Sequence, residues 1–207
     1  MDIQKKTRVL VLFYSGMGHT AALARFIAEG ALSVENTEVV VKQVPGSKAT
    51  GVEIATQEDF VSADAIAIGS PTHFGSFAAE IKAFIGGLTP LWLKGQVAGK
   101  PVAFFCSAGS MHGGEEATLI SLMIPFFNLG MIPIGIPYPI QGESPDFDSG
   151  SPYGAIFVSG HDGKNKMSEG DKKVARILGK RLAATAHLMG CGCGDCGKYK
   201  SMTHKLE

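Results

Sequence analysis

Strand-like segments alternate with helical segments along the whole chain, and this alternation constrains the fold more than any other feature. Apolar or β-branched runs, typical of buried strands, predict strands at residues 8–14, 37–44, 64–69, 101–107 and 132–136. Apolar residues at helical spacing predict helices over residues 21–32, 77–84, 115–129 and 168–189. Such alternation is typical of an α/β domain whose parallel sheet carries helices on both faces. We expect this domain over residues 1–189 and a cysteine-containing tail over 190–207, and we interpret residues 141–166 as a loop.

Ligands of such sheets bind beyond the carboxyl ends of the strands, so the glycine turn after the first strand is the first candidate site. The segment Gly16–Ala21 matches the loose dinucleotide fingerprint G-x-G-x-x-A, but the second strand does not end in the acidic residue that would bind a ribose. A triphosphate loop would need a lysine in the turn, and there is none. Backbone N–H groups at a helix N-terminus suit a terminal phosphate. The alternative is a plain strand-to-helix turn without a ligand.

Two further loops at the same sheet edge are polar and contain glycine. They follow the third and fourth strands and span residues 70–76 and 107–114. Together with the first turn they could surround a flat heteroaromatic ring, on which Phe74 and Trp92 could stack. Each loop alone would pass for an ordinary connection, so the convergence of three is the stronger signal.

Composition excludes several classes of partner. Lys plus Arg and Asp plus Glu are both 19, and this zero net charge argues against a nucleic-acid partner. The uncharged stretch 119–140 contains four prolines, so we do not expect it to span a membrane. Cys106 is isolated and the other three cysteines crowd the C-terminus, which predicts a reducing, cytoplasmic location.

Several separated motifs identify a resemblance. The segments YSGMGHT, GSPTHFGS, GKPVAFFCSAGSMHGGEEAT, LGMIPIGIPY, SPYGA and SGHDG occur in this order. With them the chain resembles the WrbA-type NAD(P)H:quinone oxidoreductases, which are flavodoxin-like FMN proteins, from Arg8 to about Met189. The resemblance implies a doubly wound five-stranded parallel sheet of order 2-1-3-4-5. It also implies ping-pong, two-electron reduction of quinones by NAD(P)H through FMN, and homotetramers whose active sites neighbouring subunits complete.

The resemblance also implies roles for individual residues. The expected FMN-binding residues are Ser15, Gly16, Met17, Gly18, His19, Thr20, Pro71, Thr72, His73, Phe74, Gly75, Ser107, Ala108, Gly109, Ser110, Met111, His112 and Gly113. Trp92 would wall the substrate side of the flavin, and Asn128 stands where a family member has a histidine over the flavin. Flavin chemistry needs no protein nucleophile, so His73 and His112 are the candidate proton donors, or else fixed hydrogen-bond partners.

The tail has its own cysteine pattern. Cys191, Cys193 and Cys196 form C-x-C-x-x-C, with His204 downstream. Three readings stay open: an iron–sulfur or zinc site, a redox-active dithiol, or an unstructured reduced tail. The alternative function is therefore a flavodoxin-like electron carrier, fed by a protein partner or by a tail centre. A binding protein that keeps the fold without the chemistry is the third candidate.

Overall fold

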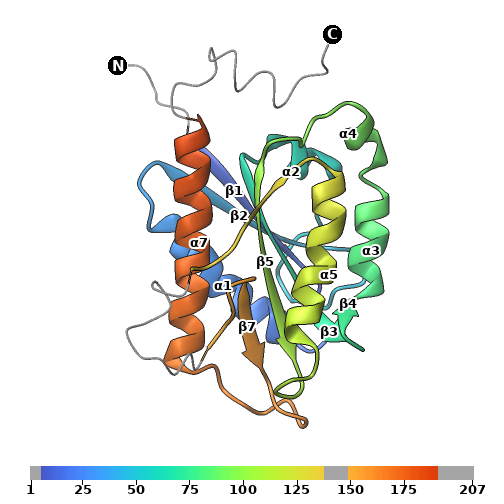
Figure 1. The fold of residues 1–207 in the computed structure, drawn as a ribbon, viewed down its shortest axis with the longest axis vertical. Coiled ribbons are helices and arrows are strands. Elements are labelled where there is room, and N and C mark those ends of the chain that lie inside the picture. Colours follow the sequence, from blue (N-terminus) through green and yellow to red (C-terminus); the bar gives the residue numbers. More distant parts are fainter. Residues whose placement is uncertain (1–5, 138–148, 191–207) are drawn as a thin grey trace.

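A mostly parallel sheet forms the centre of the computed structural model, which describes residues 6–137 and 149–190 (Figure 1). Its strands run in the order β2-β1-β3-β5-β6. This order confirms the flavodoxin-like fold expected for the chain. The strands are β1 (Thr7–Phe13), β2 (Thr37–Gln43), β3 (Ala65–His73), β4 (Ser76–Phe77), β5 (Pro101–Ala108), β6 (Ile132–Ile134) and β7 (Ala155–Val158).

The sheet has two strands more than the five expected. The short β4 pairs antiparallel with the end of β3, and β7 pairs parallel with β5. β6 lies beside Pro101–Ala103 of β5, whereas β7 lies beside Phe105–Ala108, so two half-length strands share the fifth position. The prediction of a loop over 141–166 is therefore wrong for residues 155–158, and residues 141–148 lie outside the described residues. A four-residue apolar run is too short to show a strand by its periodicity.

Helices cover both faces of the sheet (Figure 1). They are α1 (His19–Leu32), α2 (Gln57–Ser62), α3 (Ala79–Gly86), α4 (Thr89–Leu93), α5 (Glu115–Asn128) and α7 (Glu169–Gly190). One buried apolar cluster packs α1 and α7 against the sheet, and a second packs α3 and α5 against its other face. The short helices α2 and α4 are additions to the predicted elements. No helix within residues 6–137 and 149–190 has the length and apolar character of a membrane span.

Two local sequence signals explain where α1 and α2 begin. α2 starts with a capping box, in which the Thr56 hydroxyl accepts from the Asp59 N–H at 3.4 Å and the Asp59 carboxylate accepts from the Thr56 N–H at 2.8 Å. α1 starts instead after Gly18, whose φ of 90° only glycine adopts at little cost. The chain thus passes from the end of β1 to the start of α1 through a tight turn over residues 14–18.

Candidate functional site

A cavity of about 490 Å³ lies beyond the carboxyl ends of the central strands. The turn after β1, the ends of β3 and β5, and the loop after β7 meet around it. The lining residues are Tyr14, Ser15, Gly16, Met17, His19, Thr20, Lys48, Pro71, Thr72, His73, Ser107, Ala108, Gly109, Ser159, Gly160, His161, Asp162 and Gly163. This is the position at which open α/β sheets bind their ligands.

The turn after β1 forms a cradle of backbone donors. The Ser15 hydroxyl accepts from the N–H groups of Gly18 at 3.1 Å and Ala21 at 3.3 Å, which closes the turn on itself. Among the described residues, the N–H groups of the four other turn positions have no acceptor: Gly16, Met17, His19 and Thr20. The first turn of α1 contains no acidic residue. Unpaired N–H groups at the positive end of a helix fit the phosphate of FMN.

The ends of β3 and β5 continue this wall. The Thr20 and Ser107 hydroxyls are 2.8 Å apart and buried, so the cradle is tied to the end of β5. The hydroxyl of Thr72, at the end of β3, is buried beside the Cys106 thiol and is not open to the cavity. The unpaired N–H groups of the turn are therefore the feature of this wall that fits the phosphate of FMN.

Phe74 and Gly75 form the tip of the β3–β4 hairpin. Both have positive φ angles, 54° and 76°, as the hairpin turn requires, and Phe74 is fully exposed. They line no part of the cavity itself, but Phe74 lines a neighbouring hollow of about 670 Å³ that shares His73 with it. A Cβ on Gly114 would lie 2.8 Å from the Gly75 Cα, so the hairpin tip rests on the loop before α5.

The fourth loop of the cavity, Ser159 to Gly163, is the motif SGHDG of the resemblance, but it was not among the predicted site residues. It is firmly held, since the Ser159 N–H and hydroxyl both donate to the Ala108 carbonyl oxygen, at 2.8 and 3.0 Å. Its signal was present in the sequence: an apolar run followed by a polar glycine-containing loop, as after β3 and β5. Lys48 was missed, and Tyr14, which begins the motif YSGMGHT, was not among the predicted site residues. Burial, and then the hydrogen bond and the charge of Glu80, raise the pKa of Tyr14.

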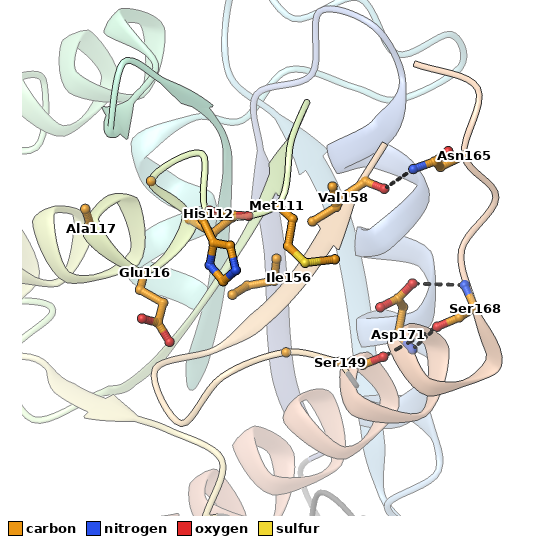
Figure 2. A pocket seen from close by; sticks show the side chains of 13 residues that line it. Met111, His112, Glu116, Ala117, Ser149, Ile156, Val158, Asn165, Ser168 and Asp171 are labelled. Carbon is orange, nitrogen blue, oxygen red and sulfur yellow. Dashed lines mark hydrogen bonds between the residues drawn. The ribbon is translucent and has the colours of Figure 1, made fainter. Parts of the chain in front are cut away.

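The predicted site residues Ser110 to Gly113 do not line the cavity at the strand ends. Met111 and His112 line a second cavity of about 690 Å³, not the first. Figure 2 shows His112 and Glu116 on one side of this second cavity and Ser168 and Asp171 on the other. The latter two form the capping box of α7, with bonds of 2.9 and 3.0 Å, which accounts for the carboxylate there.

Trp92 and Asn128 come together, but away from the cavity. They line a groove of about 550 Å³ that α3 and α4 form with α5, and this groove shares no lining residue with the cavity at the strand ends. The hollow beside Phe74 lies between the two, because it shares His73 with the cavity and Lys82 with the groove. Within one chain, the two predicted substrate residues therefore do not border the FMN-binding positions.

Cys106, the cysteine within residues 6–137 and 149–190, does not line the cavity at the strand ends. Cys106 is completely buried in β5, and this burial raises the pKa of its thiol to about 12. Cys191, Cys193 and Cys196, the predicted metal ligands, lie outside the described residues, as does His204. Within residues 6–137 and 149–190, no three His, Cys, Asp or Glu side chains are grouped as a metal site would need.

Known proteins similar to this chain agree on its family. Residues 7–145 match the model of the NADPH-dependent FMN reductase family. An NAD(P)H dehydrogenase (quinone) from Geotalea uraniireducens is 34% identical over 197 residues, covering 86% of this chain and 97% of the relative. One of the same name from Geotalea daltonii is 35% identical over 198 residues, covering 87% and 97%. A WrbA-like flavodoxin from Agrobacterium tumefaciens has the same fold, with a TM-score of 0.64 and 23% identity, over 88% of this chain and 99% of that one.

Proposed function

We propose that this chain, which belongs to the NADPH-dependent FMN reductase family, reduces quinones with NAD(P)H through bound FMN. The observation that carries the proposal is the cavity at the strand ends, where the unpaired N–H groups of the turn after β1 form a cradle for a phosphate. Bound FMN supplies the two-electron chemistry, and the protein supplies binding and orientation.

Each part of the cavity would have its own role in binding FMN. The turn Ser15 to Thr20 would hold the phosphate with backbone donors, and Ser107 would fix the turn through Thr20. Pro71, Thr72 and Ala108 would border the flavin, and the loop Ser159 to Gly163 would close the remaining wall. These roles rest on the shape and the donors of the cavity.

His73 is the better placed of the two candidate proton donors. It lines the cavity and also the hollow beside Phe74, so it stands where a substrate would enter. Its ring is also edge-on to Tyr14, with centroids 6.3 Å apart. His112 faces the second cavity, and the proposal gives it no role in catalysis.

Trp92 and Asn128 support a proposal about assembly. Their groove is separate from the cavity, so a substrate role for them requires that a second copy place them over its neighbour's FMN. The outer face of α5 is suited to such a contact, because Ile120, Ile124 and Phe127 are exposed there at helical spacing. We therefore include a homotetramer in the proposal. The cytoplasmic location and the metal at the tail cysteines stay predictions.

Anaerobic absorbance of the FMN-loaded protein tests the function. NADH or NADPH is added first and a benzoquinone second. We expect fast loss of the flavin absorbance with the nucleotide and its recovery with the quinone. A flavin that binds but is reduced only by dithionite would contradict the proposal and favour the electron carrier.

Hybrid assemblies test the shared site. One variant, Trp92→Ala, keeps the cradle, and the other, Gly16→Asp, places a carboxylate in the cradle but keeps Trp92. If neighbouring subunits complete each site, a co-expressed mixture should regain turnover that neither variant has alone. A mixture no more active than the average of its parts would show that each chain works alone.

A further inference from the structure

A lysine stands beside the phosphate cradle, and the proposed function gives it no role. Lys48 lines the cavity together with Ser15, Gly16 and Thr20, although it follows β2 and belongs to no predicted site segment. It is an exposed residue of the cavity lining, so its flexible side chain has room to reach toward the cradle. Its position depends on how the loop after β2 is held.

The backbone around Lys48 is tied directly to the cradle. The Lys48 N–H donates to the Ser15 carbonyl oxygen at 2.9 Å, and the Ser15 N–H donates to the Ser47 hydroxyl at 2.9 Å. On its other side, the amide of buried Gln43 accepts from the Ala49 N–H and donates to the Ala49 carbonyl oxygen, both at 3.0 Å. Residues on both sides of Lys48 are thus fixed, which lowers the entropy cost of placing its side chain.

The charges around the cavity leave Lys48 available. Asp162 is the only carboxylate among the lining residues, and it pairs with Lys164 at 3.5 Å. Lys48 forms no salt bridge with the residues that the structure describes. The cradle itself offers neutral donors, while a phosphate monoester carries close to two negative charges at neutral pH. A mobile ammonium group at its edge would meet that charge.

We infer that Lys48 is the cationic contact of the cofactor phosphate, and that it makes the site prefer FMN over the unphosphorylated flavin. The inference rests on the proposed function, because it assumes that the cradle holds FMN. A phosphate of the nicotinamide nucleotide is the other source of the same chemistry, and the test separates the two.

The test measures flavin affinity by fluorescence quenching on the full-length apoprotein, with FMN and riboflavin as separate probes. Lys48→Gln should raise the dissociation constant of FMN roughly three- to tenfold, while that of riboflavin stays unchanged. The difference should shrink at high salt, because the pair is exposed. Lys48→Arg should keep most of the FMN affinity. Lys180→Gln, the matched control on the exposed face of α7, makes the same change in net charge and should leave both constants unchanged.

Three results would overturn the inference. An unchanged FMN dissociation constant in Lys48→Gln would mean that the ammonium group does not reach the phosphate. An equal loss for riboflavin would mean that the substitution damages the loop. A rise only in the KM for NADH or NADPH would assign Lys48 to the nucleotide. Failure of the unsubstituted protein to bind FMN is a separate outcome, since it would contradict the proposed function itself.

Discussion

A methyl group at Gly179 should force α1 and α7 apart. A Cβ at this position would lie 2.8 Å from the carbonyl carbon of Ile27 and 2.9 Å from the backbone nitrogen of Ala31, and it would lie closer still to the Ile27 oxygen. The contact is reciprocal, because a Cβ on Gly30 would lie 2.6 Å from the carbonyl carbon of Arg176. The two helices therefore touch backbone to backbone, and no side chain can rotate away to make room.

The cost of Gly179→Ala follows from this geometry. To restore ordinary contact with the Ile27 oxygen the helices must separate by roughly 1.5 Å, and a gap of that size removes at least about half of the dispersion attraction across the interface. Overpacking of a filled core costs about 1–3 kcal/mol, and the backbone contact places this substitution at the upper end. The higher helix propensity of alanine returns up to about 1 kcal/mol. We expect a net loss of about 2 kcal/mol, which lowers the Tm of a domain of this size by roughly 4–8 °C.

Thermal unfolding followed by circular dichroism measures this loss. Gly190→Ala is the matched control, because it lies on the same helix and nothing lies within 4 Å of its added Cβ. It should leave the Tm unchanged or slightly higher. A Gly179→Ala protein as stable as the control would refute the close contact between α1 and α7.

Three further predictions concern acid stability, the hairpin and the buried thiol. Burial alone would raise the pKa of Asp59, but the hydrogen bonds from Thr56 and the charge of Lys42 lower it beneath its usual 3.8. The ionised Asp59 carboxylate therefore stabilises the fold above that pH, and this stabilisation is lost as the pH falls below it. Asp59→Asn should flatten this part of the curve of Tm against pH. A curve unchanged by the substitution would contradict the prediction. Phe74→Gly removes an exposed side chain held at positive φ, so it should raise the free energy of unfolding by up to about 1 kcal/mol while raising the KM for quinone; a lower stability in urea unfolding would contradict the first part. Cys106, buried and with its pKa raised to about 12, should resist iodoacetamide in the native protein and react in urea, as mass spectrometry of the labelled peptides would show; rapid native labelling would mean that β5 opens.

The sequence predicted the central sheet well because its inner strands β1, β3 and β5 are largely buried and read as continuous apolar runs. Every predicted strand overlaps an observed one, and the order β2-β1-β3-β5-β6 is the expected one. The prediction failed for short elements, where periodicity carries little information. The six residues of α2 could still have been found from their capping box, because Thr56 and Asp59 stand at the required spacing. The four residues of β7 carry no such mark.

Missing β7 had a consequence for the site, because the loop that follows each central strand forms part of the cavity. β7 continues the fifth strand position beyond the end of β6 and reaches the carboxyl end of β5, where Ser159 bonds to Ala108. Without this strand, the segment Ser159 to Gly163 has no defined place and cannot be assigned to the cavity. Lys48 escaped for a related reason, since only the hydrogen bonds to Ser15 show that the loop after β2 returns to the cradle.

Trp92 and Asn128 show a different limit of sequence reasoning. A motif identifies which residues serve a site, but it does not say which copy of the chain supplies them. The fold places these two residues in one groove, so the two predicted substrate-binding residues do lie close together. It also separates the groove from the cavity by the hollow that Phe74 and Lys82 line. A common role in quinone binding therefore requires an assembly in which the groove of one chain faces the cavity of another, and the hybrid experiment decides between that assembly and a self-sufficient chain.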